Sequence, residues 1–274
     1  MAVNVTNLGV EGLRSINRYF FYQLVAVILA IIAEVIAFTL IGSASAIAGA
    51  ALQSAQSAGL IAAVVLLVII ELVLLVFSVY ATLSLMFGIR DLRRSQFKNS
   101  AAYAGISKWL KWLVILSVIL VAIIAVFALA LIASIVTSLI SSYSGLGLGS
   151  TSAGSGAQTY LSMVLVFTFL LMVVELVFGW KLSTLYKKLS SDISQKSLNT
   201  AGTLLLAGII IFFIGGLASL ANGFSSVGSL YASAGTGGTG LGLIATIIDF
   251  VGLIVFAASL YLGWTGTSAA LKKA

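Results

Sequence analysis

The chain has 274 residues, of which 61% are hydrophobic and 8% are charged, with a formal net charge of +7 at pH 7. A soluble domain carries about 25% charged residues, so this composition excludes a soluble protein. The sequence contains neither Cys nor His. It offers no disulfide, no thiolate nucleophile and no imidazole ligand for haem, zinc or copper, and we expect no metal or other cofactor.

Positive charge alternates with apolar sequence along the chain. Basic residues next to an apolar span resist translocation, so the segments that carry them are expected on the cytoplasmic side of a membrane. Because this charge is divided among short pieces, it favours anionic lipid headgroups as its partner and does not predict nucleic-acid binding. All fourteen Lys and Arg residues lie in the segments 14–18, 90–111, 181–196 and 272–273.

Six apolar runs are long enough to cross a hydrocarbon core of about 30 Å, which takes about 20 helical residues. The sequence therefore predicts an all-α, multi-pass protein of the cell membrane with both termini in the cytoplasm. Pro is absent from the chain, which removes the usual cause of a broken helix. In chain order the predicted spans are 20–42, 60–88, 110–138, 159–180, 203–222 and 242–264.

The segments at the predicted cytoplasmic helix ends resemble one another. Residues 12–19 match residues 105–112 at Gly, apolar, basic and aromatic positions, and residues 90–92 match residues 187–189. In the second pair of segments the matching positions are Arg90 with Lys187 and Leu92 with Leu189. These matches predict one transmembrane domain built from three helical hairpins. Any set of hairpins has such residues at its cytoplasmic ends, so a simple shared layout is an equally good interpretation. The hairpins would be 1–100, 101–198 and 199–274.

The Trp residues and the central basic segments indicate contact with the membrane surface. Indole rings prefer the headgroup zone, which predicts interface anchors. The basic side chains are expected to contact lipid headgroups, either from short amphipathic helices on the surface or merely as topology determinants. The predicted anchors are Trp109, Trp112, Trp180 and Trp264, and the predicted headgroup contacts are Arg90, Arg93, Arg94, Lys98, Lys187 and Lys188.

Four acids inside the predicted spans are the strongest candidates for a functional site: Glu34, Glu71, Glu175 and Asp249. A charge at the centre of a bilayer costs at least about 2.5–3.5 kcal/mol. No Lys or Arg lies deep enough to pair with these acids, so they are expected to be protonated, hydrogen-bonded or exposed to water. Glu175 lies six residues before Lys181 and could reach the interface by snorkelling.

Glu34 and Asp249 share two further features. Each has Ala, Gly or Thr at helical spacing on its own face, which lets a neighbouring helix approach and predicts that both acids face protein. At 1.5 Å per residue, both lie about 22–24 Å from the cytoplasmic boundary. They are therefore candidates for one intramembrane polar site, used either for ion or proton transfer or as a protonated packing contact; Glu71 and Glu175 are weaker candidates.

The sequence Val10-Glu11-Gly12-Leu13-Arg14 precedes the first span, and a six-helix layout with basic inner loops follows it. Together these features resemble the uncharacterised archaeal membrane-protein family called domain of unknown function 973. The resemblance implies an archaeal cell membrane. Since that family has no established activity, it transfers no functional residue.

An enzyme is not expected. Asp249 is the only Asp in a predicted span, no His is present, and inner loops of about twenty residues are shorter than the 50 or so that a domain needs. The sequence favours a non-enzymatic structural or accessory subunit of a membrane complex, whose partners are lipids and other membrane-protein subunits or a second copy. The alternative is a small proton- or cation-coupled permease that uses the intramembrane carboxyl groups.

Overall fold

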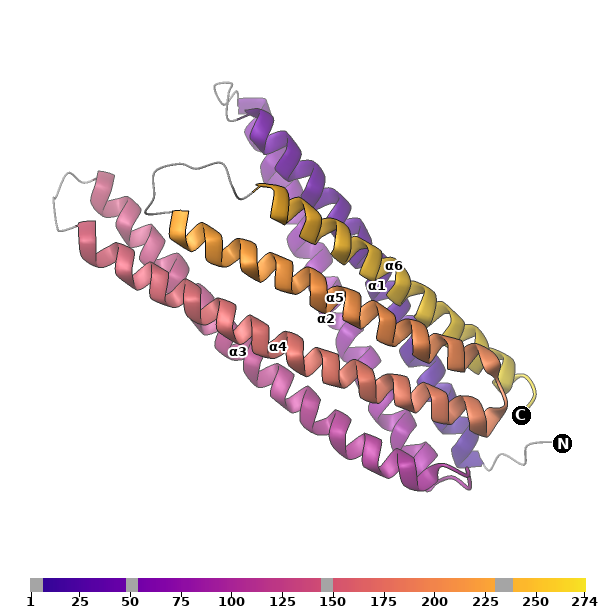
Figure 1. Cartoon of the computed structure of the whole chain (residues 1–274). Helices are drawn as coiled ribbons and strands as arrows, with labels where there is room; N and C mark the ends of the chain where they lie inside the picture. The colour runs from indigo at the N-terminus through magenta and orange to yellow at the C-terminus, as the bar shows by residue number, and fades with distance from the viewer. Residues whose placement is uncertain (1–6, 48–53, 144–149, 230–238) are drawn as a thin grey trace. The chain divides into compact units, whose positions relative to one another are not determined.

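The computed structural model describes residues 7–47, 54–143, 150–229 and 239–274, and each of these ranges is helical over most of its length. Figure 1 shows the helices, coloured along the chain. Their bounds are α1 (Asn7–Ile47), α2 (Ser54–Arg94), α3 (Ser100–Tyr143), α4 (Ser150–Ile193), α5 (Lys196–Ser229) and α6 (Thr239–Leu271).

All six helices are long and apolar enough to cross a membrane, which confirms the predicted six-span helical fold. They have 33 to 44 residues, whereas a span needs about 20. The extra turns continue into the basic segments, because these contain no Pro and keep an apolar stripe at helical spacing. Leu85, Ile89 and Leu92 form such a stripe and are fully buried.

The described connections at the basic ends of the helices are therefore short: residues 95–99 join α2 to α3, and residues 194–195 join α4 to α5. Separate amphipathic surface helices, one of the two predicted arrangements for the basic side chains, are not present in these segments. Arg90, Arg93 and Arg94 lie on α2 itself, and Lys187 and Lys188 lie on α4. A charged residue has good helix propensity, so charge alone does not end a helix.

Hydrogen bonds cap the C-terminal ends of α2 and α4. The hydroxyl of Ser95 donates to the carbonyl oxygen of Leu92 at 2.6 Å and closes the last turn of α2. After α4, Ser194 adopts a left-handed backbone conformation with φ of 54°, and the N–H of Gln195 donates to the carbonyl oxygen of Ser190 at 3.1 Å. This is a Schellman motif, which lets the chain reverse within two residues.

The chain forms two compact units. Unit 1 comprises residues 1–108, 182–208 and 252–274, and unit 2 comprises residues 109–181 and 209–251. Every Lys and Arg except Lys111 and Lys181 belongs to unit 1. Unit 1 thus contains the ends of the six helices that carry nearly all the positive charge, and we call these the basic ends.

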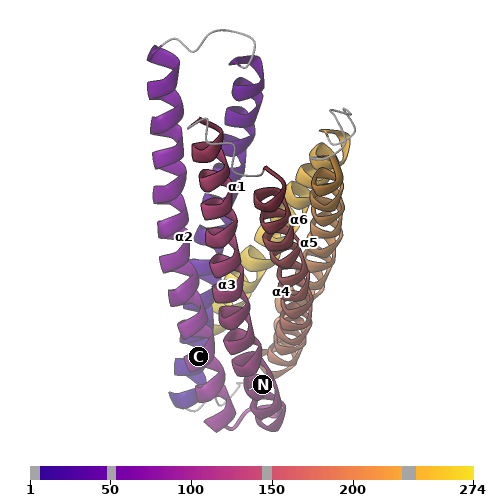
Figure 2. The same cartoon turned by 90° about the vertical axis from the view of Figure 1, so that its left-hand side faces the viewer.

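In unit 1, α1 and α2 run side by side (Figure 2). Their backbones approach closely at Gly12 and Gly88: a Cβ atom on Gly12 would lie 3.0 Å from the carbonyl oxygen of Gly88. Next to this contact, the rings of Phe20 and Tyr186 are buried, with centroids 4.9 Å apart. The close approach lets large rings from α1 and α4 fill the interior of the unit.

Buried hydroxyl groups connect further helices in unit 1. Ser183 of α4 donates to the carbonyl oxygen of Gly202 of α5 at 2.6 Å, and Ser259 of α6 donates to that of Ala201 at 2.7 Å. Thr267 of α6 donates to the side-chain oxygen of Asn17 of α1 at 2.7 Å. The start of α1 and the end of α6 therefore lie together (Figure 1).

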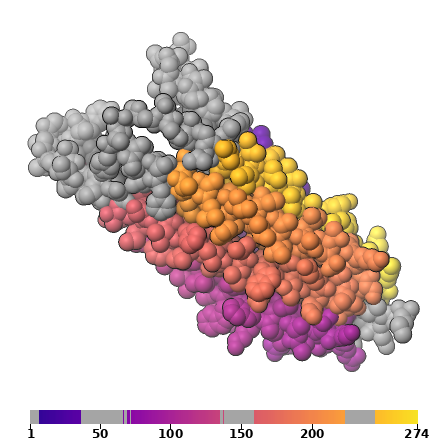
Figure 3. All heavy atoms as spheres, viewed as in Figure 1, coloured from indigo at the N-terminus to yellow at the C-terminus, as the bar shows by residue number. Residues whose placement is uncertain are grey.

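Unit 2 has a smaller apolar core. Leu113, Leu120 and Val174 are buried, and Phe167 packs against them and stacks on Phe127 at 5.7 Å. Met172 of α4 packs against Gly216 of α5, and the side chains of these two helices form a continuous surface in Figure 3. In the most apolar stretches of α3 and α4, only 6% of the residues are fully buried inside the protein. The other described residues of these stretches are half-buried or exposed.

Candidate functional site

Asp249 lies at a close contact between α6 and α5 in unit 2. Its half-buried carboxyl group faces Gly215, and a Cβ atom on Gly215 would overlap the Oδ1 atom of Asp249. Ala245, one turn earlier on α6, is buried. The missing side chain at Gly215 thus provides the space that the carboxyl group fills. The sequence signal for this contact was a Gly-Gly pair at 215–216 inside a span, and the sequence interpretation did not use it.

Glu34 does not take the position expected from its neighbours. Ala26 and Ala33 are buried in unit 1, but the side chain of Glu34 is exposed. On the face of Glu34 itself, Ala30 is half-buried and the side chain of Ala37 lies outside the described part of the structure. Glu34 lies about 100° further round the helix than Ala33. Because Glu34 belongs to unit 1 and Asp249 to unit 2, the predicted pairing of these two acids stays a prediction.

The other two intramembrane acids lie on α2 and α4. The side chain of Glu71 is outside the described part of the structure. Glu175 is exposed on α4. Among the described residues the one ion pair joins Arg90 to Asp91, so neither Glu34 nor Glu175 has a basic partner there.

The predicted headgroup contacts lie on the basic ends. Arg90 pairs with Asp91 at 3.2 Å and its guanidinium lies 5.1 Å from the ring centroid of Phe87. The other five predicted headgroup contacts form no ion pair in the described part of the chain, and they are all exposed: Arg93, Arg94, Lys98, Lys187 and Lys188. Their contact with lipid stays a prediction.

A polar cluster around Asp192 was missed by the sequence interpretation. The carboxylate of Asp192 accepts hydrogen bonds from the hydroxyl of Tyr103 at 2.5 Å and from the amide of Asn99 at 2.6 Å. The same amide donates to the hydroxyl of Ser191 at 2.9 Å. These bonds tie the turn between α2 and α3 to the end of α4. The available signal was that Asp192 is the only acid in the segment 181–196.

The four predicted Trp anchors occur in two settings. In unit 1, the ring of Trp264 lies 6.2 Å from that of Phe21. In unit 2, the ammonium group of Lys181 lies 5.1 Å from the ring centroid of Trp109 and 4.7 Å from that of Trp180. Trp112 is 63% exposed. Lys181 was not predicted to contact these rings, although Trp180-Lys181 at the end of a span is a visible aromatic-basic pair.

The described residues contain no group of three or more acids that could hold a metal ion. Comparison with models of known protein families, with curated proteins and with solved structures finds no match. These comparisons therefore assign no function to the chain, and the resemblance to domain of unknown function 973 stays a prediction.

The Asp249–Gly215 contact predicts a specific mutational coupling. Gly215→Ala should lower thermal stability, because its methyl group would occupy the space of the Asp249 carboxyl, and overpacking costs about 1–3 kcal/mol. Asp249→Ala removes the group that the methyl meets, so the double variant should lose less stability than the two single losses together. The measurement is thermal unfolding of the detergent-solubilised protein.

Gly105→Ala is the matched control for this prediction, because a Cβ atom there has nothing within 4 Å. It should be neutral or slightly stabilising, since Ala favours a helix over Gly. Equal effects of Gly215→Ala and Gly105→Ala would show that the carboxyl group does not fill the space beside Gly215.

Proposed function

We propose that this multi-pass membrane protein is a non-enzymatic structural or accessory subunit of a membrane complex. Its partners would be other membrane-protein subunits or a second copy of the chain, with the basic ends in the cytoplasm. The observation that carries the proposal is the exposure of Glu34 and Glu175 within the apolar stretches of α1 and α4 that the structure describes.

The physical argument concerns what such carboxyl groups contact in a membrane. Glu34 follows Arg18 by sixteen residues, which places it about 24 Å along the helix from that basic end. A polar group facing lipid at this depth is costly, and polar side chains on neighbouring helices are its usual partners. The exposed large side chains that the structure describes in this stretch of α1 are apolar: Ile28, Ile32 and Val35. A polar or basic group from another chain would satisfy the carboxyl.

The surface of α4 supports the same proposal. Its exposed side chains include Met163, Val166 and Leu170, and Glu175 is the one acid in this apolar stretch. A helix surface that is apolar apart from a single acid gives a helix–helix interface both contact area and one polar contact that favours a register. A subunit that recognises a partner inside the membrane would have these properties.

Purification in mild detergent tests the proposal. The wild-type protein should be isolated in a stable complex, either with other membrane proteins or as an oligomer of defined mass. Glu34→Leu and Glu175→Leu should reduce the recovered complex at least about fivefold, since each removes a polar contact worth about 1 kcal/mol in a membrane. Light scattering and mass spectrometry of the purified material measure this.

Glu11→Gln is the matched control, because Glu11 is exposed near the start of α1, on the other side of Arg18 from Glu34. It should leave the complex intact. Recovery of the wild-type chain as a homogeneous monomer would contradict the proposal, as would equal losses for Glu11→Gln and the two Leu variants.

One observation favours a second candidate function, a small proton- or cation-coupled permease. The carboxyl group of Asp249 lies between two helices of unit 2, opposite Gly215. A carboxyl group at such a position can take up and release a proton or hold a cation. The permease would use Asp249, together with Glu34 if the two acids meet.

Proton flux into proteoliposomes tests this candidate. Asp249→Asn keeps the size of the side chain but cannot ionise, so a flux that depends on this carboxyl should fall at least about tenfold. Asp91→Asn is the control, because Asp91 lies on a basic end and pairs with Arg90, and it should leave the flux unchanged. The permease is contradicted by a wild-type flux equal to that of empty liposomes, or by an unchanged flux in Asp249→Asn.

A further inference from the structure

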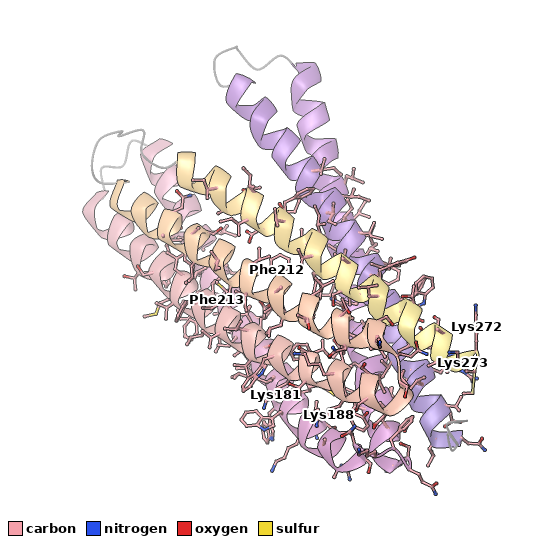
Figure 4. All side chains as sticks on the ribbon, turned by 45° about the vertical axis from the view of Figure 1, so that its right-hand side comes forward. Lys181, Lys188, Phe212, Phe213, Lys272 and Lys273 are labelled. Atoms are coloured by element: carbon pink, nitrogen blue, oxygen red, sulfur yellow. The ribbon has the colours of Figure 1, made fainter. Side chains whose placement is uncertain are left out.

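The ammonium group of Lys181 has an unusual setting in unit 2. It lies 4.7 Å from the ring centroid of Trp180 and 5.1 Å from that of Trp109. The first ring belongs to α4, like Lys181 itself, and the second belongs to α3. Lys181, labelled in Figure 4, projects from the α4 ribbon. Two helices thus hold one cation beside two aromatic faces.

The two rings stabilise the charge of Lys181, but they offer no lone pair to accept hydrogen bonds from its ammonium group. An aromatic face attracts a cation through its quadrupole, whereas an ammonium group has three N–H donors that require lone-pair acceptors. In the described part of the chain Lys181 forms no ion pair. The cation is therefore positioned by the rings and keeps donors for an anion.

The location of the cluster indicates which anion is available. Lys181 directly follows the predicted span 159–180, and Trp rings concentrate where hydrocarbon meets headgroups. Trp109 is 54% exposed and Trp180 is 56% exposed, while Lys181 itself is half-buried. At this depth of a bilayer the abundant anion is the phosphate of a phospholipid, and indole rings pack well against the glycerol and upper acyl carbons beside it.

We propose that Lys181, Trp109 and Trp180 form a binding site for the phosphate group of an anionic phospholipid. The ammonium group donates charge-assisted hydrogen bonds to the phosphate oxygens, and the exposed parts of the two indole rings cover the adjoining lipid carbons. The site differs from the exposed Arg and Lys residues of the basic ends, because aromatic rings from two helices fix the position of its cation.

Indole fluorescence tests this site directly. The chain has four Trp residues, so Trp112→Phe and Trp264→Phe leave Trp109 and Trp180 as the only indole reporters. Short-chain phosphatidylglycerol titrated into this detergent-solubilised protein should change the emission in a saturable way. Lys181→Met, which keeps most of the apolar stem, should weaken the apparent affinity about tenfold or more, because a charge-assisted hydrogen bond is lost.

Two matched variants separate a defined site from general attraction. Lys111→Met removes an exposed charge from α3 in the same unit and should weaken binding by no more than about fivefold, the contribution of one basic residue near an anionic surface. Lys181→Arg keeps the charge and donors and should stay within about threefold of the parent. Similar losses in Lys181→Met and Lys111→Met would overturn the proposal.

A titration with inorganic phosphate distinguishes a site for a phospholipid from a site for free phosphate. Titrated without lipid, it lacks the carbons that the indole rings would cover, so it should give a far weaker response than phosphatidylglycerol. A saturable response to inorganic phosphate with none to phosphatidylglycerol would overturn a lipid site. An unchanged titration in Lys181→Met, with Lys181→Arg also unchanged, would overturn any role for this cation.

Discussion

The fold depends on the close packing of the basic ends, where hydroxyl groups reach the backbone of the neighbouring helix. Ser183 and Ser259 are buried, and each donates to a carbonyl oxygen of α5. Left unpaired, a buried hydroxyl costs about 1–3 kcal/mol, so these bonds favour one register between the helices. The short side chains at Ala201 and Gly202 let the backbones come near enough for the bonds to form. The turn after α2 is held by a side-chain bond, in which the amide of Asn99 donates to the carboxylate of Asp192.

The acids inside the spans present the opposite situation. Asp249 has a place prepared for it by Gly215, whereas Glu34 and Glu175 are exposed on apolar helices. Within a membrane this difference matters more than the number of acids, because a carboxyl group facing lipid favours a polar partner. The contact of Asp249 is internal to the chain, which suits a permease. Glu34 and Glu175 are exposed, which suits a subunit that binds a partner. The lipid site proposed at Lys181 is compatible with either function.

The six spans could be predicted from sequence because bilayer thickness imposes a minimum apolar length, and apolar runs are visible without any tertiary information. The helix ends could not be predicted in this way. Lys187 and Lys188 indicated a membrane boundary, but α4 continues past them to Ile193. Small neighbours on the face of Glu34 predicted that this acid faces protein, but the buried small residues are Ala26 and Ala33, beside that face, and Glu34 is exposed. The bonds of Asp192 join residues 89 and 93 positions apart, and such pairs have no local signature in one sequence.

The start of α1 and the end of α6 meet in one packed unit, and cross-linking tests this contact most directly. The chain contains no Cys, so Asn17→Cys with Thr267→Cys introduces the only two thiols. The native side-chain oxygens of these residues are 2.7 Å apart. Mild oxidation of membranes should join this pair rapidly, and Asn17→Cys with Thr265→Cys, which lies on another side of α6, should react far more slowly. Equal rates for the two pairs would contradict the account.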